Sequence, residues 1–491
     1  MCIRDSTKPD HFDTNIIVLG AGSGGLISAL IAAAVKANVT LIEKHKMGGD
    51  CLNTGCVPSK ALIKTARFLY DVNHSQKYGV KTASAEFDFK DVMARVQAAI
   101  KKIEPHDSVE RFTELGVDCV TGEGKLVSPW AVEVNGKTIT ARNIILATGA
   151  RPFMPPIEGL EQSNWYNSDT LWDMQEQPKR LIVLGGGPIG CEMAQSFSRL
   201  GSEVSVVEMA PSIMIREDTE ISDMIRDKFV AEGINVLTGT RAVSVQAASG
   251  GGHELVCDQD GKEVKVEFDG LIVAIGRRPN VEGFGLEELG VTLRKNNTVE
   301  VDDFLRTNYE NIFAVGDVTG PYQFTHTAAH QAWFAAVNSL FGQFKKFKAD
   351  YSVIPWATFT DPEVARVGLN EIEAKEKGIA YEITTYGIDG LDRAIAESED
   401  HGVVKVLTVP GKDKILGVTI VGSQAGNMIA EFVTAMKYKF GLKKILGTIH
   451  TYPTMMEANK GVAGNWQKAH APQKILSLLG KFHNWRLGKK K

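Results

Sequence analysis

The residues Ile16-Ile-Val-Leu-Gly-Ala-Gly-Ser-Gly-Gly25 begin the pattern that decides the fold of this chain. An apolar strand enters a Gly-x-Gly-x-x-Gly loop, an alanine-rich helix follows, and a second strand, Val39 to Ile42, ends at an acid. In such a unit the glycines permit a tight turn, close approach of a diphosphate to the backbone, and close packing of helix on strand, while the acid hydrogen-bonds a ribose. The sequence therefore predicts a dinucleotide site formed by Gly20, Gly22, Gly25 and Glu43.

The same pattern occurs a second time further along the chain. The strand Leu181 to Leu184 leads into Gly185-Gly-Gly-Pro-Ile-Gly190, and the next strand ends at Glu208. In each copy the acid lies 23 positions after the first glycine (43 − 20 and 208 − 185). An acid at this place favours the free 2′-hydroxyl of NAD over the phosphate of NADP. The second site is therefore predicted to bind NAD through Gly185, Gly187, Gly190 and Glu208.

A pair of cysteines lies between the two copies, in Gly48-Gly-Asp-Cys-Leu-Asn-Thr-Gly-Cys-Val-Pro-Ser-Lys60. The run Ala61 to Val72 that follows is typical of a helix with proline in its first turn. A helix N-terminus stabilises a thiolate through its dipole and unpaired N–H groups, and Lys60 adds positive charge, so Cys51 and Cys56 are expected to be reactive. A regular helix would hold their Cα atoms roughly 7.5 Å apart, so a disulfide requires the intervening loop to fold back.

Composition narrows the class of protein. A chain of 491 residues predicts about three domains, and the apolar fraction of 43% and charged fraction of 23% are those of an ordinary globular protein. The net charge of −4 argues against nucleic acid as the main partner.

The six cysteines are too few for a secreted disulfide scaffold and form no zinc-type cluster, so we expect a reducing cytoplasm and no resident metal. The uncharged run Ile16 to Val35 could suggest a membrane span, but its glycines fit the nucleotide loop better.

The cysteine stretch resembles the redox motif of the flavoprotein disulfide reductases, which include dihydrolipoamide dehydrogenase, glutathione reductase and mercuric reductase. The resemblance extends from about Asp13 to Trp466. It implies FAD in the first dinucleotide site and a homodimer. By the same resemblance Cys51 would exchange with substrate and Cys56 would contact the flavin. Asp50 departs from the family, which usually has threonine there; because a carboxylate is unfavourable beside a diphosphate, we expect its side chain to point elsewhere.

Further segments are similar to signatures of the same family. Ile144 to Ala150 resembles its second dinucleotide signature, Leu271 to Asn280 the segment that closes the nicotinamide domain, and Asn311 to Asp317 its second FAD signature. Lys60 and Glu192 match a lysine–glutamate pair that the family places beside the flavin and nicotinamide. For FAD the resemblance implies the additional residues Lys60, Gly124, Thr148, Gly149, Gly316 and Asp317. Asp317 would hold a ribityl hydroxyl of the flavin. For NAD the resemblance implies Gly276.

The family also has a C-terminal His-Pro-Thr-x-x-Glu element that reaches across the dimer and supplies the acid/base for substrate thiols. Here the segment is His450-Thr-Tyr-Pro-Thr-Met-Met-Glu457, with Tyr452 at the base position. Tyrosine titrates at about 10 and imidazole at about 6.5, so efficient dihydrolipoamide oxidation is disfavoured. The chain is in this respect more like mercuric reductase, although no cysteine follows Cys257 to deliver a metal. The catalytic residues implied are Cys51, Cys56, Lys60, Glu192, His450, Tyr452 and Glu457.

The predicted fold is therefore α/β, with two Rossmann-like dinucleotide-binding domains and an α+β dimerisation domain. The predicted ranges are 10–155 with 285–350 for FAD, 156–284 for NAD(P), 351–468 for dimerisation and 469–491 for a basic amphipathic tail. The tail is expected to pack on the dimer or to be solvated, with a membrane-surface helix as the alternative.

The predicted function is electron transfer between NAD(P)H, FAD and a Cys51–Cys56 disulfide, with a small-molecule disulfide, dithiol or thiophilic metal ion as substrate. Dihydrolipoyl dehydrogenase activity, with His450 as the base, is an open alternative. A redox-sensing flavoprotein with little turnover is another.

Smaller expectations concern turns and ends. Phe89 to Leu115 is predicted to be helical with a break at Pro105, and Asn135-Gly136 to form a hairpin turn within Ala131 to Thr140. Gly250-Gly-Gly252 is predicted to form another hairpin turn. The leader has no periodicity, so its Cys2 is assigned no role.

Overall fold

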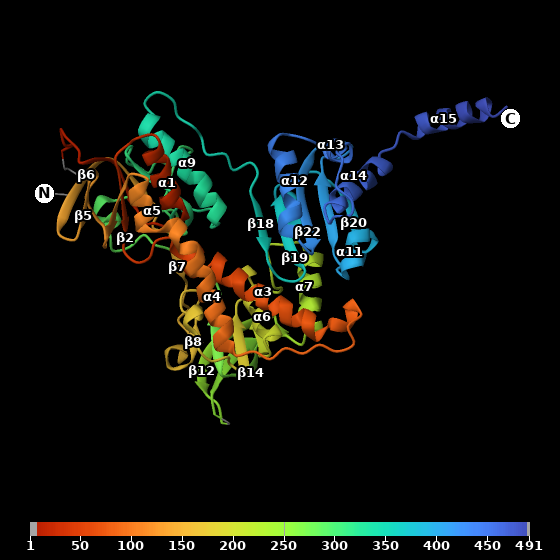
Figure 1. Cartoon of the computed structure of the whole chain (residues 1–491), viewed down its shortest axis with the longest axis horizontal. Coiled ribbons are helices and arrows are strands. Elements are labelled where there is room, and N and C mark those ends of the chain that lie inside the picture. The colour runs from red at the N-terminus through yellow and green to blue at the C-terminus, as the bar shows by residue number, and fades with distance from the viewer. Residues whose placement is uncertain (1–6, 250, 489–491) are drawn as a thin grey trace. The chain divides into compact units, whose positions relative to one another are not determined.

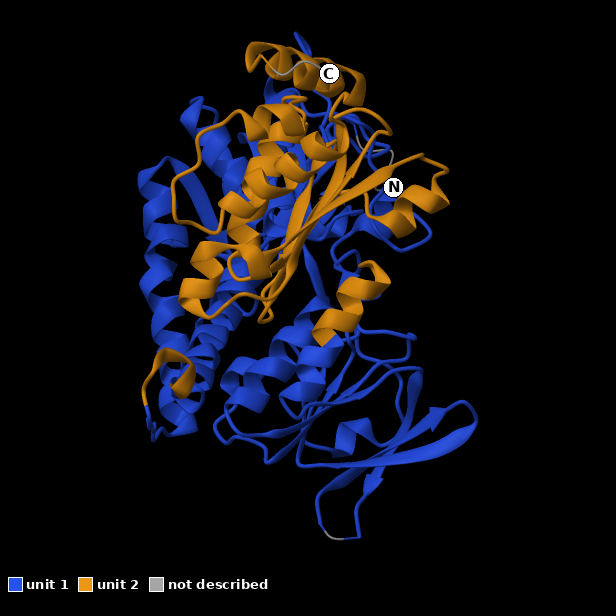
Figure 2. Ribbon diagram, turned by 90° about the vertical axis from the view of Figure 1, so that its right-hand side faces the viewer, with its two compact units in different colours: residues 1–75, 81–215, 226–350 blue, residues 76–80, 216–225, 351–491 orange. Residues whose placement is uncertain are grey.

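The computed structural model describes residues 7–249 and 251–488. The chain forms two compact units (Figure 2). Unit 1 comprises residues 1–75, 81–215 and 226–350, and unit 2 comprises residues 76–80, 216–225 and 351–491. The expectations for Cys2 and for Gly250 in a turn lie outside the described residues.

The first sheet of unit 1 is built around a buried strand that precedes the first glycine loop (Figure 1). Its strands are β1 (Thr14–Leu19), β2 (Val39–Glu43), β3 (Val117–Thr121), β4 (Lys125–Ser128), β5 (Ala131–Val134), β6 (Lys137–Leu146) and β17 (Ile312–Ala314). Parallel pairing gives the order β3-β2-β1-β6-β17, while β4, β5 and the first half of β6 form an antiparallel extension. The predicted turn at Asn135 and Gly136 is confirmed, because both residues have positive φ.

A second parallel sheet of unit 1 repeats this arrangement around the second glycine loop. Its strands are β8 (Trp165–Tyr166), β9 (Arg180–Leu184), β10 (Glu203–Val207), β11 (Asn235–Leu237) and β15 (Gly270–Val273). Their order, β11-β10-β9-β15-β8, again places the strand before the loop at the centre. Unit 1 also contains an antiparallel sheet of β12 (Thr240–Ala247), β13 (His253–Gln259) and β14 (Lys262–Phe268), and a pair formed by β7 (Ala150–Pro152) and β16 (Arg277–Pro279).

Helices cover these sheets and position the redox segment. α1 (Ser23–Ala34) packs on α9 (Thr325–Phe341), and α3 (Cys56–Asn73) packs on both α4 (Phe89–Ile103) and α6 (Pro188–Arg199). The break predicted near Pro105 is confirmed, because a 3-10 turn, Glu104–Asp107, separates α4 from α5. The remaining helices here are α2 (Gly49–Asn53), α5 (Val109–Glu114) and α8 (Leu286–Leu289), while α7 (Thr219–Ala231) has its residues 219–225 in unit 2 and the rest in unit 1.

Unit 2 has an antiparallel sheet in the order β18-β19-β22-β21-β20. Its strands are β18 (Pro355–Thr358), β19 (Glu363–Gly368), β20 (Glu382–Gly387), β21 (Val403–Thr408) and β22 (Ile415–Gly422), and its helices are α10 (Glu371–Glu376), α11 (Asp392–Glu397), α12 (Ala425–Lys437), α13 (Leu442–Leu446), α14 (Glu457–Ala469) and α15 (Gln473–Arg486). Phe432 of α12 and Trp466 of α14 lie in its apolar core. The predicted α/β fold class, with two dinucleotide-type sheets and an α+β unit, is thus confirmed.

Candidate active site

Glycines bring the redox segment against the first nucleotide loop. Gly48 has a φ of 86°, and a Cβ there would lie 2.4 Å from the Leu52 side chain. A Cβ on Gly49 would lie 2.6 Å from the Cα of Gly22, and the N–H of Gly48 donates to the carbonyl of Ala21 at 2.9 Å. A side chain at Gly49 would push the two loops apart, and a side chain at Gly48 would collide with Leu52 within the redox segment. The backbone itself therefore fixes the cysteines next to the predicted FAD loop.

The two cysteines belong to two helices rather than one. Cys51 lies in α2, whereas Cys56 is the first residue of α3, and Thr54 and Gly55 separate the helices. The expectation that both thiols lie at one helix N-terminus is thus wrong for Cys51, because Thr54 ends α2 before the next helix begins. The loop does fold back: both residues are free thiols, and their side chains are hydrogen-bonded to each other.

The hydrogen bond between the thiols makes them chemically unequal. Donation from Cys51 lowers the pKa of Cys56 to about 6, assisted by a contact with Thr325 Oγ1 at 3.5 Å and by the charge of Lys60. The same hydrogen bond, together with burial, raises the pKa of Cys51 above its ordinary value. Cys56 is exposed and Cys51 is partly buried. At neutral pH Cys56 is therefore the thiolate and Cys51 keeps its proton.

The expected lysine–glutamate contact is present beside the cysteines. Lys60 Nζ lies 2.8 Å from Glu192 Oε2, and the Glu192 side chain is only 7% exposed. Lys60 comes from α3 and Glu192 from α6, the helix that follows the second glycine loop. The contact therefore connects the redox helix to the predicted nicotinamide site.

The glycines of the first loop separate into packing positions and an open position. A Cβ on Gly25 would lie 1.8 Å from the carbonyl oxygen of Gly20, and Gly20 has a φ of 100°. Around a Cβ on Gly22, by contrast, the nearest atom would be 3.9 Å away. The first and third glycines are thus required by the fold, whereas the middle one leaves space above the loop.

The second loop shows the same division. A Cβ on Gly190 would lie 1.9 Å from the carbonyl oxygen of Gly185, but a Cβ on Gly187 would meet nothing within 4 Å. A bound diphosphate explains a glycine whose position the protein itself does not crowd. The residues present therefore fit one dinucleotide over each loop.

The acids at the strand ends have matching environments. Glu43 accepts hydrogen bonds from the N–H groups of Ala21 at 2.6 Å and His45 at 2.8 Å. Glu208 accepts from Gly186 at 2.5 Å and Ala210 at 2.7 Å. Each carboxylate is thereby held at the rim of its loop, where the sequence pattern expects a ribose.

An ion pair determines where the unusual Asp50 points. Its Oδ2 lies 2.6 Å from Arg277 Nη2, and its Oδ1 accepts from Thr54 Oγ1 at 2.6 Å. Arg277 also lies 3.7 Å from Asp317 Oδ2, and its Nε is buried without a hydrogen-bond partner. Burial raises the pKa of Asp317 to about 6. A buried donor without a partner and a poorly solvated carboxyl group fit a site that receives a polar ligand.

The other residues predicted to bind FAD or NAD make hydrogen bonds or close packing contacts within unit 1. Thr148 Oγ1 donates to the carbonyl of Asn280, whose side chain donates to the carbonyl of Thr148, each at 2.8 Å. The N–H of Gly316 donates to Gln331 Oε1 at 2.6 Å. A Cβ on Gly124 would lie 2.8 Å from Leu19, so packing alone explains that glycine, while Gly149 and Gly276 have positive φ.

The C-terminal candidates lie in unit 2. His450 has both ring nitrogens engaged, Nδ1 at 3.2 Å from the Thr448 carbonyl and Nε2 at 2.9 Å from Glu431, and its side chain is 5% exposed. Tyr452 donates to Asp392 at 3.0 Å, which raises the pKa of the phenol. Glu457 accepts from the N–H of Thr454 at 3.4 Å. Neither aromatic candidate is an efficient base in these surroundings.

Sequence reasoning missed several neighbours of the thiols. Thr325 is 269 positions from Cys56, and no local pattern distinguishes it from other helix-starting residues. Arg277 stands in a segment that the sequence did mark, but its pairing with Asp50 could not be inferred from spacing. Asp169, whose carboxyl pKa is raised by burial and by the charge of Asp50, gave no signal.

Comparison with known proteins identifies the class. Residues 14–332 match the family model described as pyridine nucleotide-disulphide oxidoreductase, and residues 354–463 match the dimerisation domain of that family. The chain belongs to this family and is an FAD-dependent oxidoreductase that uses a nicotinamide cofactor and forms homodimers.

Individual relatives have different activities. The chain is 34% identical to a mercuric reductase of Lysinibacillus sphaericus over 94% of this chain and 83% of that protein. It is 35% identical to a dihydrolipoyl dehydrogenase of Chlamydia muridarum over 90% of this chain and 94% of that protein. Among solved structures it resembles the HOCl-induced flavoprotein disulfide reductase RclA of Escherichia coli, also solved as a Cu(II) complex, with a TM-score of 0.82, 25% identity, and coverage of 92% of this chain and 99% of that one.

Proposed function

We propose that Cys51 and Cys56 are the redox pair of this oxidoreductase and that its acceptor is a thiophilic metal ion or a small disulfide. The observation that supports this most strongly is the position of the thiol segment, which packs Gly49 against Gly22 of the first nucleotide loop and pairs Lys60 with Glu192 after the second. The lowered pKa of Cys56 and the raised pKa of Cys51 agree with it. By the family resemblance, the Cys56 thiolate would contact the flavin and Cys51 would react with the acceptor.

The two nucleotide loops define which residues would hold the cofactors. FAD would be held by Gly20, Gly22, Glu43 and Asp317, in a domain of residues 10–155 and 285–350, and it supplies two-electron transfer between nicotinamide and disulfide. The nicotinamide cofactor would be held by Gly187, Glu208 and Gly276, in residues 156–284. Lys60, paired with Glu192, supplies a positive charge that favours the Cys56 thiolate.

The protonated state of Cys51 favours a metal ion as acceptor. Attack on a disulfide requires the Cys51 thiolate, so a base must take the proton. A soft metal cation instead deprotonates the thiol by binding it. The raised pKa of Cys51 and the engaged nitrogens of His450 therefore hinder the disulfide reaction more than the metal reaction. The Cu(II) complex of RclA and the mercuric reductase relatives support the same choice.

Two electrons pass through the thiol pair in each cycle. The reduced cysteines give up these electrons as their disulfide re-forms, and one thiol proton, that of Cys51, is released, because Cys56 is already a thiolate. A divalent ion such as Hg(II) takes both electrons in one cycle, whereas two Cu(II) ions take one each. An acceptor disulfide would take both electrons and two protons to become two thiols.

Dihydrolipoyl dehydrogenase activity is the second candidate, since relatives with that activity are equally similar. In that reaction electrons pass from a dithiol substrate through the cysteine pair and FAD to NAD, and a base must take the protons of the dithiol. His450 would have to leave Glu431 to serve as that base.

NAD is proposed as the nicotinamide cofactor in preference to NADP. Glu208 directly follows β10 and has both carboxylate oxygens held by backbone N–H groups, and the nearest Lys or Arg after it is Arg216, eight positions further on (216 − 208). A 2′-phosphate would meet a carboxylate and no nearby cation from this loop.

The proposal is tested by anaerobic titration of the purified FAD protein with NADH, followed by separate addition of Cu(II), Hg(II), lipoamide and glutathione disulfide. We expect a long-wavelength thiolate–flavin band that Cys56→Ser abolishes and Cys51→Ser retains. Sustained NADH consumption is expected with a metal ion.

Other outcomes would change the assignment. Turnover with lipoamide alone would favour the second candidate. A single stoichiometric reduction without turnover on any acceptor would favour a redox sensor, and absence of the band would refute the cysteine assignment. NADPH preferred over NADH would refute the nicotinamide assignment.

A further inference from the structure

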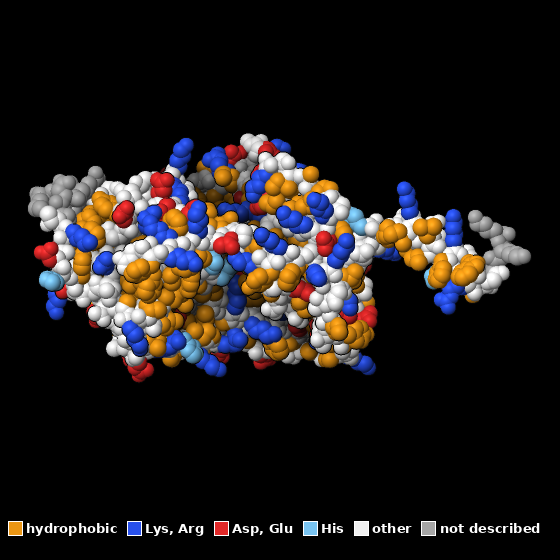
Figure 3. All heavy atoms as spheres, turned by 90° about the horizontal axis from the view of Figure 1, so that it is seen from above, with side chains coloured by type: hydrophobic (Ala, Val, Ile, Leu, Met, Phe, Trp, Pro, Cys, Tyr) orange, Lys and Arg blue, Asp and Glu red, His pale blue; other side chains and the backbone are white. Residues whose placement is uncertain are grey.

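The last helix of the chain has an apolar surface that unit 2 does not cover. Every residue of α15 is exposed, including Phe482 at 46% and Trp485 at 73%. Figure 3 shows apolar and basic side chains together along this helix, at the right-hand end of the molecule. The exposed large apolar side chains of the segment are Ile475, Leu476, Leu478, Leu479, Phe482, Trp485 and Leu487.

These side chains gather on one side of the helix. At about 100° per residue the seven fall within an arc of about 200°, while Gln473, Ser477, Gly480 and Asn484 lie opposite. Lys474 and Lys481 lie at one rim of the apolar arc. His483 and Arg486 fall inside the arc, where a long arginine can extend its charged end outward from an apolar surface.

The charge of the segment has one sign. From Pro472 to the last residue the sequence contains six Lys or Arg and no Asp or Glu, although the whole chain has a net charge of −4. Lys474, Lys481 and Arg486 belong to α15, and the other three are the terminal lysines in the sequence. The family model for the dimerisation domain ends at residue 463, so this segment lies outside what defines that domain.

We propose that α15 is a docking surface for an anionic lipid bilayer and binds parallel to the membrane plane. Its apolar arc would enter the boundary between head groups and acyl chains, with Trp485 and Phe482 as interfacial anchors. Its lysines and arginine would contact anionic head groups, each contributing to binding at low ionic strength. No helix in residues 7–249 and 251–488 is long and apolar enough to cross a membrane, so the contact is peripheral.

Charge complementarity distinguishes the bilayer from a second copy of the chain. The rest of the chain has a net charge of −10 (−4 − 6), but it contains 49 Lys or Arg (55 − 6) among its 59 Asp or Glu, so its negative charge is interspersed with positive charge. An anionic bilayer instead presents negative charge throughout. The aromatic residues also match the interfacial enrichment of Trp in membrane-associated helices. The earlier expectation of packing on the dimer thus becomes the alternative that the experiment must exclude.

The test is co-sedimentation of the intact FAD dimer with vesicles of phosphatidylcholine alone or mixed with phosphatidylglycerol. We expect binding to the mixed vesicles, little binding to phosphatidylcholine, and release by high salt. Leu478→Ser with Phe482→Ser should abolish binding, and Lys474→Gln with Lys481→Gln should lower it at least about tenfold. The matched control, Ser477→Ala with Asn484→Ala, changes the opposite side of the same helix and should bind like the wild type.

Several results would overturn the proposal. Equal binding to both vesicle types, or binding unchanged by the Leu478 and Phe482 substitutions, would do so. Protection of α15 from hydrogen exchange in the vesicle-free dimer would show that a second copy already covers it. If α15 bound DNA with the same salt dependence as vesicles, and the Leu478 and Phe482 substitutions did not weaken that binding, the segment would be a general polyanion-binding site and not a membrane-binding helix. NADH turnover in solution should be the same for all four proteins, because none of the substitutions touches the thiols.

Discussion

The hydrogen bond between Cys51 and Cys56 sets which sulfur is the thiolate in the reduced protein. The Cys51 thiol donates to Cys56, so the Cys56 thiolate is favoured and its pKa lies near 6. In the reduced protein the rate of Cys56 alkylation by iodoacetamide should therefore rise with pH through a midpoint at about 6. Cys51→Ala removes the main stabilising donor, so the midpoint should move upward toward the ordinary thiol value of about 8.5. Peptide mass analysis of the alkylated protein measures both curves, and an unchanged midpoint would contradict the shared-proton arrangement.

Asp50 acts on the same pair through its charge. Its carboxylate raises the pKa of both cysteines, while its ion pair with Arg277 holds α2 in place. Asp50→Asn keeps the hydrogen-bonding shape but removes the charge, so the Cys56 midpoint should fall below its wild-type value. Asp169→Asn is the control, because that nearby carboxyl is not among the groups that shift either thiol. If the midpoint of Cys56 alkylation instead rose in Asp50→Asn, the charge of Asp50 would not be what raises the pKa of Cys56, and this prediction would be wrong.

At the scale of the elements, two glycines of the second glycine loop allow the effect of a side chain on stability to be measured apart from its effect on cofactor binding. Gly187→Ala adds a methyl group where nothing lies within 4 Å, so the free energy of unfolding should change by less than about 0.5 kcal/mol while KM for NADH rises. Gly190→Ala places the same methyl group 1.9 Å from a carbonyl oxygen and should destabilise the protein. Thermal unfolding and NADH kinetics on both variants give the comparison. Equal KM values for Gly187→Ala and wild type would remove the cofactor from this loop.

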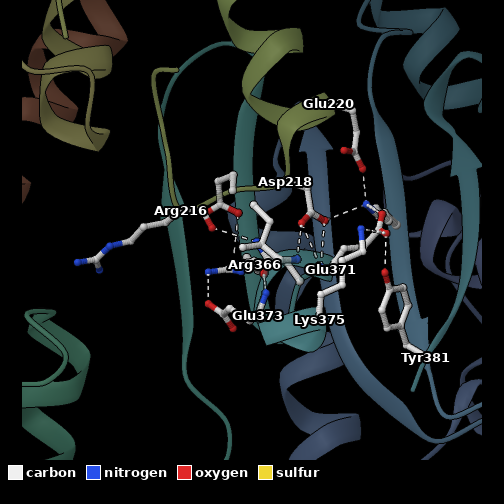
Figure 4. A network of polar contacts seen from close by, with 12 residues as sticks. Arg216, Asp218, Glu220, Arg366, Glu371, Glu373, Lys375 and Tyr381 are labelled. Atoms are coloured by element: carbon white, nitrogen blue, oxygen red, sulfur yellow. Dashed lines mark hydrogen bonds and ion pairs between the residues drawn. The ribbon is translucent and has the colours of Figure 1, made fainter. Parts of the chain in front are cut away.

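Buried ions organise the sheet of unit 2 (Figure 4). Lys405 on β21 is 4% exposed and donates to Asp218 at 2.8 Å, to Glu371 at 2.6 Å and to Glu220. Beside it, Arg366 is held by Glu217 and by Glu373 and lies 4.2 Å from the Trp356 ring. The segment from Arg216 to Ile225 is thereby tied to strands that follow it by more than a hundred positions in the sequence.

Removing the central cation should be costly. Lys405→Met leaves the buried Asp218 and the partly buried Glu371 without this partner, so we expect a loss of about 3–5 kcal/mol in the free energy of unfolding of unit 2. Lys375→Met is the matched control, because Lys375 pairs with the same Glu371 but is 67% exposed, and should cost less than about 1 kcal/mol. Urea denaturation of both variants measures the difference, and similar losses would show that burial does not govern this network.

The contrast between loop and network explains what the sequence could predict. Gly20, Gly25 and Glu43 interact within one short unit, so their spacing alone predicted the turn. The contact of Cys56 with Thr325 and that of Lys405 with Asp218 join residues 269 and 187 positions apart. Such pairings depend on how whole sheets and helices pack, and no local periodicity encodes them. Even near the motif, Asp50 could be recognised as unusual but not assigned to Arg277.

At the scale of the whole molecule, the residue at position 452 bears on which of the two proposed activities the dimer can perform. The resemblance places the Tyr452 region of one subunit at the thiols of the other, where dihydrolipoamide oxidation needs a base. Tyr452 has a raised pKa because it donates to Asp392, and His450 is buried against Glu431. Both candidate bases are thus already engaged, His450 with Glu431 and Tyr452 with Asp392.

Restoring an imidazole at this position tests that interpretation. Tyr452→His should increase kcat/KM for dihydrolipoamide oxidation by about a hundredfold, the lower range for general-base catalysis, with a rise in rate through a pH of about 6.5. Metal-ion reduction should change little, because metal binding removes the Cys51 proton without a base. Tyr452→Phe removes the phenol without adding a base, so it should leave the low dihydrolipoamide rate unchanged and serves as the control. A gain as large in Tyr452→Phe would mean that access to the thiols, rather than proton transfer, limits this enzyme with dithiols.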